Sequence, residues 1–191
     1  MKLLQDRIRK DGCALSEHVL LVDSFLNHQV DPQLMADIGA EFARLTRDMG
    51  ITRVVTIESS GIAPAQMTAL ALGVPMVILK KSSSAILKEG TVQTEVFSFT
   101  KNSSYQLTLK TKFVQPDDKV LLIDDFLANG EAATGAARLI EGLGAKIAAI
   151  GIVIEKSFQP GRGILEDKGY KVFSLARVAS MSEGHVDFVE P

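Results

Sequence analysis

The sequence is poor in the residues that build disulfide frameworks and metal cages. It has one cysteine, Cys13, no tryptophan and two tyrosines among 191 residues. A single cysteine excludes an intramolecular disulfide and a thiolate metal cage, and it is typical of a protein from a reducing compartment. Long apolar runs are also lacking, because the longest, at 147–154, has eight residues. A helix that spans a bilayer needs about 20.

The charge is nearly balanced, so neither sign dominates. The chain has 21 Lys and Arg against 23 Asp and Glu, which gives a formal net charge of -2. This balance offers no overall electrostatic reason to bind nucleic acid or an anionic membrane. Residues 1–7 carry charges and no long apolar region, so we do not expect a signal peptide. The length and composition predict one domain over residues 1–191, in the cytoplasm.

What the sequence does contain is an alternation of apolar strands with helical patterns. Asp31 and Pro32 are typical of a helix start, and Gly50 is typical of a helix end. Apolar or β-branched runs at 53–57, 76–79, 120–123, 147–154 and 171–175 alternate with helical segments at about 63–72, up to 143, and at 163–168. This order predicts an α/β fold with a doubly wound, mainly parallel sheet, in which ligands sit at the carboxyl ends of the strands.

The most informative segment runs from 120 to 135. A continuous apolar strand ends in Asp124 and Asp125, and a short turn with Gly130 leads into a helix. Backbone N–H groups and the helix dipole at such a turn bind phosphate. Two adjacent carboxylates suit ribose hydroxyls or a hydrated Mg²⁺. Judged from these residues alone, the two acids are also compatible with a plain turn cap, since the two common glycine-rich nucleotide motifs are absent.

The same segment resembles the diphosphoribosyl-binding signature of type I phosphoribosyltransferases, which has four apolar residues, two acids, two apolar residues and a glycine-containing turn. These enzymes join a base to 5-phosphoribosyl 1-diphosphate (PRPP) and release diphosphate. The resemblance implies their fold, with a small hood from the N- and C-terminal segments and a flexible hairpin lid. It implies that Asp124 and Asp125 are the catalytic residues and hold the ribose hydroxyls. It also implies Mg²⁺ that is held mainly through PRPP and water, with no direct protein ligand.

The resemblance extends to further segments in chain order. Ser59, Ser60 and Gly61 stand in the place of the diphosphate loop, and Lys81 ends the next strand, where a basic residue contacts diphosphate. Residues 81–104 stand in the place of the mobile lid, with Thr100 or Lys101 where adenine enzymes carry a glutamate. The residues assigned in this way to PRPP are Ser59, Ser60, Gly61, Lys81, Ala128, Asn129, Gly130, Glu131 and Ala132. Many members have threonines at the positions of Asn129 and Ala132, so here phosphate binding would rest on backbone N–H groups, with Glu131 turned outward.

The choice of base is indicated by three parts of the chain. Ala128 stands where hypoxanthine–guanine enzymes carry an acidic residue, which favours the adenine-like and xanthine-like branch. Residues 22–32 resemble the N-terminal signature of bacterial xanthine phosphoribosyltransferases, and the likeness extends over essentially the whole chain. It implies xanthine contacts at Leu20, Asn27 and Lys156, and a homodimer. A lysine at the edge of xanthine would offer a charge-assisted hydrogen bond to an exocyclic oxygen.

The sequence therefore predicts a purine-salvage enzyme that converts xanthine and PRPP into xanthosine 5′-monophosphate and diphosphate. Two alternatives stay open at this point. One is a preference for guanine or hypoxanthine. The other is a regulator that binds PRPP without catalysis, although the residues before Asp23 are too few for a winged helix that binds DNA.

Overall fold

The computed structural model describes residues 1–82, 89–98 and 103–190. Over these residues the centre of the molecule is an eight-stranded sheet in the order β10-β9-β8-β7-β3-β4-β6-β5. Its parallel strands are β3 (Arg53–Ile57), β4 (Met76–Ser82), β7 (Lys119–Leu127), β8 (Lys146–Lys156) and β9 (Val172–Ser182). The antiparallel edges are β5 (Thr91–Ser98), β6 (Ser103–Lys110) and β10 (His185–Phe188). The predicted doubly wound, mainly parallel sheet is confirmed.

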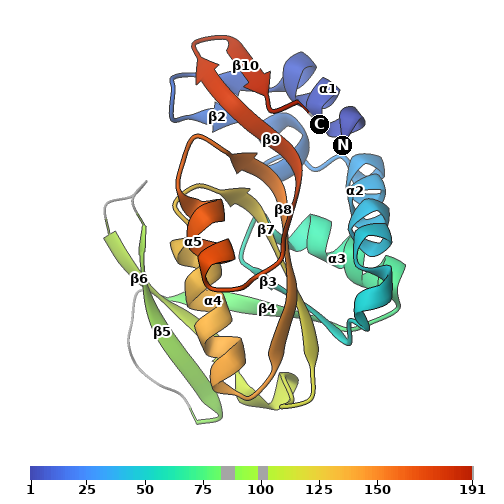
Figure 1. Ribbon diagram of the computed structural model, residues 1–191, viewed down its shortest axis with the longest axis vertical. Helices are drawn as coiled ribbons and strands as arrows, with labels where there is room; N and C mark the ends of the chain where they lie inside the picture. Colours follow the sequence, from blue (N-terminus) through green and yellow to red (C-terminus); the bar gives the residue numbers. More distant parts are fainter. Residues whose placement is uncertain (83–88, 99–102, 191) are drawn as a thin grey trace.

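Helices cover both faces of this sheet (Figure 1). On one face lie α2 (Pro32–Leu45) and α3 (Ile62–Leu72), and on the other lie α4 (Glu131–Gly142) and α5 (Gly161–Asp167). Strand β7 is apolar in every position from 120 to 123 because both of its faces are buried. Leu121 and Ile123 join the core cluster under α2 and α3, whereas Val120 and Leu122 join the cluster under α4.

The start of α2 follows the sequence signals closely. The side chain of Asp31 accepts a hydrogen bond of 3.1 Å from the amide of Leu34, and Pro32 occupies the first turn. The α-helix ends at Leu45, and a separate 3-10 turn, Arg47–Met49, follows it. Gly50 then adopts a left-handed conformation. The predicted helix end at Gly50 is therefore the end of this extra turn.

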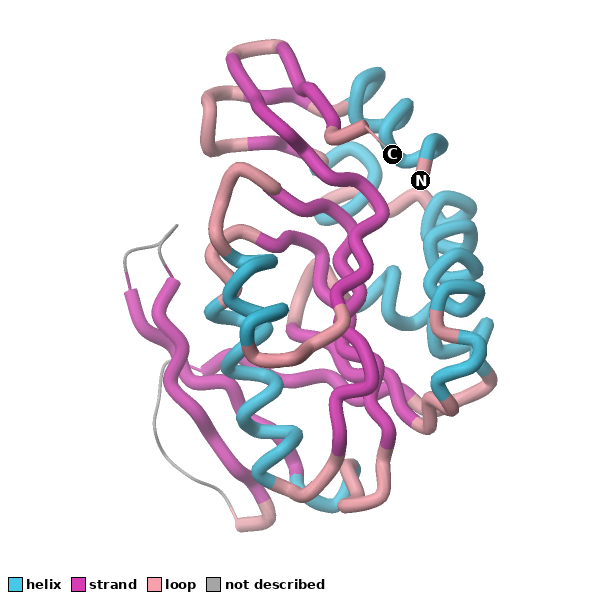
Figure 2. The backbone as a smooth tube through the Cα atoms, viewed as in Figure 1, coloured by secondary structure: helices cyan, strands magenta, loops and turns pink. Residues whose placement is uncertain are grey.

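A hood of short elements stands at the top of the sheet in Figures 1 and 2. It combines α1 (Lys2–Asp11), the two-residue strands β1 (Cys13–Ala14) and β2 (Leu20–Leu21), a π-helix at Asp23–Asn27, and the hairpin of β9 with β10. The amide of Gly184 donates to the carbonyl of Ala14 at 2.9 Å, which joins the two ends of the chain. The hood implied by the resemblance is present, and the strand predicted at 171–175 extends into it.

The segment expected to form a lid is a hairpin in its described part. Strands β5 and β6 pair in antiparallel register, and β6 continues the sheet from β4. The hairpin packs on α4, where the guanidinium of Arg138 donates to Thr94 Oγ1 at 2.7 Å. Residues 83–88 and 99–102, with Thr100 and Lys101, lie outside the described residues. Within the described ranges, no helix has the length and apolarity to cross a bilayer.

Candidate active site

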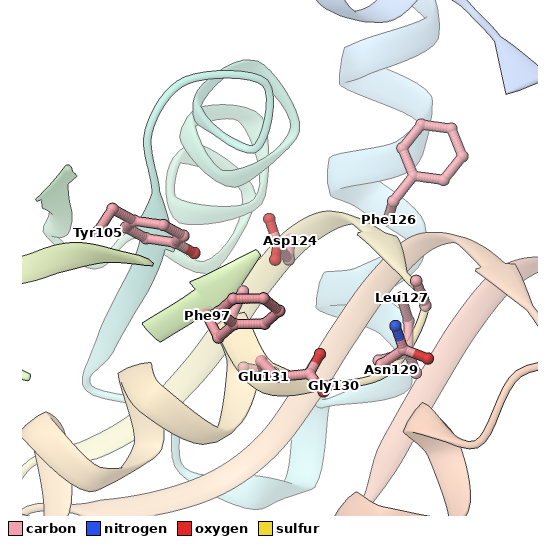
Figure 3. A pocket seen from close by; sticks show the side chains of 11 residues that line it. Phe97, Tyr105, Asp124, Phe126, Leu127, Asn129, Gly130 and Glu131 are labelled. Atoms are coloured by element: carbon pink, nitrogen blue, oxygen red, sulfur yellow. The ribbon is translucent and has the colours of Figure 1, made fainter. Parts of the chain in front are cut away.

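The candidate site lies at the carboxyl ends of three neighbouring parallel strands. Strand β7 pairs with β3 on one side and with β8 on the other, so the loops that follow these strands meet at one edge of the sheet. A cavity of about 120 Å³ opens there. It is lined by Phe97, Tyr105, Asp124 and the stretch from Phe126 to Ala133. Figure 3 shows this cavity between the hairpin and the start of α4.

The loop from Ala128 to Gly130, here called the phosphate loop, connects β7 to α4. Gly130 has a φ of +90°, a conformation that side chains rarely adopt. It turns the chain so that α4 begins at once with Glu131. The amides of the first helical turn have no partners within the helix, and they carry the positive end of the helix dipole. The loop is therefore a ready anion site that rests on backbone groups.

Asp124 and Asp125 lie near the carboxyl end of β7, which continues past the predicted strand end to Leu127, next to this loop. Asp124 is 8% exposed, and its Oδ1 accepts a hydrogen bond of 3.0 Å from the amide of Asp125. Burial raises the pKa of Asp124 well above its ordinary value, and the neighbouring charge of Asp125 raises it further. The positive charge of Lys81 acts in the opposite direction. The pair therefore keeps a proton to higher pH than two separate aspartates would.

The loop after β3, which includes Ser59, Ser60 and Gly61, approaches the same carboxylates. A Cβ placed on Gly61 would lie 2.4 Å from Thr56 Oγ1 and 3.5 Å from Asp124 Oδ1, so only glycine fits here. The peptide bond between Glu58 and Ser59 is cis. Thr56 Oγ1 is buried and has no hydrogen-bond partner among the described residues. The structure thus places the predicted diphosphate loop next to the acidic pair.

The two lysines at the end of β4 have different surroundings. The carboxylate of Glu58 accepts a hydrogen bond of 2.9 Å from the ammonium of Lys80 and one of 2.5 Å from the backbone amide of Lys81. Burial would raise the pKa of Glu58, but these hydrogen bonds outweigh it and lower that pKa. The side chain of Lys81 instead lies over the ring of Tyr105, 5.3 Å from its centroid. Lys81 is therefore the lysine that faces the cavity side.

Tyr105 is a cavity residue that sequence reasoning missed. It projects from β6 toward Asp124 (Figure 3). Burial raises the pKa of Tyr105 to about 12, and the carboxylates of Asp124 and Glu131 contribute to this shift. The phenol is therefore a hydrogen-bond donor at neutral pH. The charge of Glu131 contributes to the raised pKa of Tyr105, and Glu131 lines the cavity. The carboxylate was expected to turn outward, but it lies on the cavity side.

The residues predicted to contact the base lie in the hood and at the end of β8. The ammonium of Lys156 donates to the carbonyl of His18 and lies 5.6 Å from the centroid of the Phe126 ring. Burial lowers the pKa of Lys156. His18 lies in the loop between β1 and β2, and Leu20 is buried in β2 of this short hairpin. Asn27 is exposed at the end of the π-helix. In the part of the chain that the structure describes, these three side chains do not line the cavity of Asp124.

The acidic residues do not converge as a protein-only metal site would require. Throughout residues 1–82, 89–98 and 103–190, no group of three or more His, Cys, Asp or Glu side chains could hold an ion together. Asp124 and Asp125 offer hard oxygen ligands at one strand end. A cation here would need further oxygens from a substrate and from water.

The fold and this site define a class of protein. Residues 29–190 match the phosphoribosyl transferase domain family, and the chain belongs to that family. The adenine phosphoribosyltransferase of Giardia lamblia, solved with 9-deazaadenine, has the same fold, with a TM-score of 0.76 and 24% identity. The likeness covers 91% of this chain and 97% of that one.

Closer relatives carry a more particular name. A Clostridium botulinum protein named xanthine phosphoribosyltransferase 1 is 60% identical over the full length of both chains. The xanthine phosphoribosyltransferase of Exiguobacterium is 55% identical, over 100% of this chain and 98% of its own. That of Pseudomonas aeruginosa is 54% identical over the full length of both chains.

Proposed function

We propose that this chain is a xanthine phosphoribosyltransferase of purine salvage, acting in the cytoplasm. It would transfer the 5-phosphoribosyl group of PRPP to xanthine and release diphosphate. The observation that carries the proposal is the arrangement after β7, where two carboxylates and an anion-binding loop share one cavity. The name shared by full-length relatives of 54–60% identity supports xanthine as the base.

The residues around the cavity fit the parts of PRPP in order. Ala128, Asn129, Gly130, Glu131 and Ala132 would bind the 5′-phosphate through backbone amides, and Asp124 with Asp125 would accept from the ribose hydroxyls. Ser59, Ser60, Gly61 and Lys81 would hold the diphosphate. As diphosphate departs, positive charge develops on the anomeric carbon, and the nearby carboxylates stabilise it. No side chain needs to form a covalent intermediate, since the base nitrogen attacks the same carbon.

The carboxylate pair also fits Mg²⁺ bound mainly by PRPP and water. Asp124 and Asp125 are oxygen ligands of the kind that Mg²⁺ prefers. Bound Mg²⁺ would neutralise negative charge on the departing diphosphate.

For the base, we propose contacts with Leu20, Asn27 and Lys156. Lys156 is the last residue of β8, the neighbour of β7, so it lies at the same edge of the sheet as the acidic pair. Phe126 points away from Asp124 toward this region (Figure 3) and offers an aromatic surface near the lysine. An amide, an ammonium and an apolar side chain together suit a flat ring with two exocyclic oxygens.

The test is a product assay with PRPP, Mg²⁺ and one base at a time. Xanthine, guanine, hypoxanthine and adenine are compared at equal concentrations, and nucleotide and diphosphate are quantified. We expect xanthosine 5′-monophosphate and diphosphate in equal amounts, with the highest kcat/KM for xanthine. A higher value for guanine or hypoxanthine would contradict the choice of base, and PRPP binding without any product would indicate a regulator.

We further propose that the enzyme is a homodimer. Helix α3 is apolar around most of its circumference, and Leu70 on it is 76% exposed. An all-apolar helix normally packs on both sides, so its outer side suits a second copy. Light scattering should give twice the 20.6 kDa of one chain. Leu70→Glu should shift the mass toward the monomer, and an unshifted dimer would exclude this face.

A further inference from the structure

The side chain immediately before Lys156 is a buried carboxylate with several partners. Glu155 is 1% exposed and receives hydrogen bonds from Arg162 Nη2 at 2.6 Å and from Arg162 Nε at 3.0 Å. Ser157 Oγ donates at 2.6 Å, and Arg177 Nε donates at 3.2 Å. Burial would raise the pKa of Glu155, but the hydrogen bonds from Arg162 and Ser157 outweigh it and lower that pKa to about 2. The carboxylate is therefore ionised and fixed in one orientation.

Arg162 connects this carboxylate to two other elements. The residue lies in the first turn of α5, and its Nη2 also donates to Ser174 Oγ at 3.0 Å on β9. Its Nη1 donates a hydrogen bond of 2.7 Å to Glu166 on α5 and one of 3.3 Å to the carbonyl of Val172. A guanidinium with this many donors in a planar array holds α5 at a defined position against β8 and β9.

The residue before Arg162 touches the phosphate loop directly. The amide of Gly161 donates a hydrogen bond of 2.9 Å to the carbonyl of Ala128. A Cβ on Gly161 would lie 2.4 Å from that carbonyl oxygen, and one on Gly130 would lie 3.3 Å from Gly161. The backbones of α5 and the phosphate loop are therefore in contact with no side chain between them. Any shift of α5 moves the phosphate loop.

A short, hydrogen-bonded segment joins Lys156 to Gly161. The amide of Gln159 donates a hydrogen bond of 2.9 Å to the carbonyl of Lys156. The amide of Ser157 donates one of 2.8 Å to the carbonyl of Val178. The ion pair of Glu155 with Arg162 closes this segment at both ends. Its position is unlike that of an ion pair that only adds stability. Glu155 adjoins the proposed base contact, Lys156, and Arg162 adjoins Gly161, whose amide is hydrogen-bonded to the phosphate loop.

We propose that the Glu155–Arg162 ion pair positions Lys156 and the phosphate loop together, so that two residues outside the substrate sites set the affinity for both xanthine and PRPP. The proposal rests on the roles proposed above for Lys156 and the phosphate loop. Glu155 and Arg162 are positioning residues, because each acts through a neighbour.

The principal test is Arg162→Lys, which keeps the charge and removes the planar fork. We expect the KM for xanthine and the KM for PRPP to rise together by about 10-fold, since small displacements of binding groups have effects of this size. The kcat should fall less than either KM rises, because the displaced groups hold the substrates and do not contact the breaking bond. The Kd values of PRPP and xanthosine 5′-monophosphate, measured by calorimetry, should rise in parallel.

The matched control is a buried ion pair at the opposite ends of the strands. Arg53 Nε lies 2.7 Å from Asp118 Oδ2, with both side chains largely buried. Asp118→Asn should lower the melting temperature and leave both KM values within twofold of wild type. The same result for Arg162→Lys, a loss of stability alone, would overturn the proposal. A rise in only one of the two KM values would overturn it as well.

A second variant keeps the test decisive if Arg162→Lys does not fold. Glu155→Gln keeps the size of the side chain and removes the charge that pairs with Arg162. We expect the KM and the Kd for PRPP to rise by about 10-fold, and unchanged values would overturn the proposal. Wild-type protein that binds PRPP but makes no nucleotide would contradict the proposed function, while the calorimetric comparison would still decide the role of the ion pair.

Discussion

The ammonium of Lys156 donates a hydrogen bond of 2.5 Å to the backbone carbonyl of His18. This contact ties the end of β8 to the hairpin that carries Leu20. A base that engages Lys156 must replace or share this bond. Because a carbonyl is a neutral acceptor, an oxygen of xanthine that bears partial negative charge would compete well for the ammonium.

Lys156→Ala should weaken the use of xanthine selectively. Loss of one charge-assisted hydrogen bond costs roughly 1.5–3 kcal/mol, which corresponds to about a 10–150-fold lower kcat/KM for xanthine. Hypoxanthine lacks the 2-oxygen and should lose less. Steady-state kinetics with both bases measure the difference. Lys146→Ala, at the other end of β8, is the control and should change neither value. Equal losses for the two bases would place Lys156 near the oxygen that they share.

Asp125→Ala should lower turnover at least about 100-fold and leave the fold intact. Removal of a group that stabilises charge in a transition state costs about 100-fold or more. Turnover is measured at saturating PRPP and xanthine, so that a change in affinity alone is not counted. Circular dichroism and thermal unfolding check the fold. Turnover close to that of wild type would contradict the role proposed for the acidic pair.

Glu131→Gln should lower the KM for PRPP. The carboxylate stands beside the cavity in which we place the 5′-phosphate, so it repels the ligand, by about 1 kcal/mol for a partly solvated pair of charges. We therefore expect a decrease of about 5-fold at low salt, and a smaller one at high salt, where charges are screened. The same change removes an acid from the first turn of α4, so the helix should lose about 0.3–1 kcal/mol. A higher KM would mean that Glu131 assists binding.

The stability contributed by Glu155 should depend on pH in a defined window. Its pKa is about 2 in the folded protein against an ordinary 4.5. A carboxyl group with a lowered pKa in the folded protein contributes its full stabilisation at pH values above its ordinary pKa. This contribution is lost as the pH falls toward 2. Urea unfolding of wild type and Glu155→Gln should therefore differ by about 3 kcal/mol near pH 7, and the gap should close between pH 4.5 and 2. A gap that is constant from pH 7 to 3 would contradict this account.

The central strands and their loops could be predicted from the sequence because the signals there are local. Residues 120–123 of β7 are a continuous apolar run, which a strand buried on both faces requires, and the two acids follow this run directly. The N-cap at Asp31 needs only the residues that follow it. The acidic pair and the phosphate loop adjoin in sequence, so their proximity follows from the chain itself.

The hood and the walls of the site depend on distant pairing, which the sequence pattern does not contain. Strands β1 and β2 have two residues each and exist through the pairing of Cys13 with Leu21 and of Ala14 with Leu20. Tyr105 reaches the cavity because the hairpin register sets it opposite Val96. Glu155 could have been noticed as a carboxylate directly after a long apolar run. Its partner Arg162 lies in a short helix with no marked pattern.

One missing side chain fixes the spacing between the hairpin and the phosphate loop. Gly135 lies in α4, and a Cβ there would lie 2.4 Å from Val96 Cγ2. The hairpin strand thus rests directly on the helix backbone, one turn beyond the anion site. A methyl group at position 135 would push β5 outward and widen the gap that Tyr105 spans. The width of the candidate site therefore depends on the absence of a side chain at position 135, on the face of α4 that meets the hairpin.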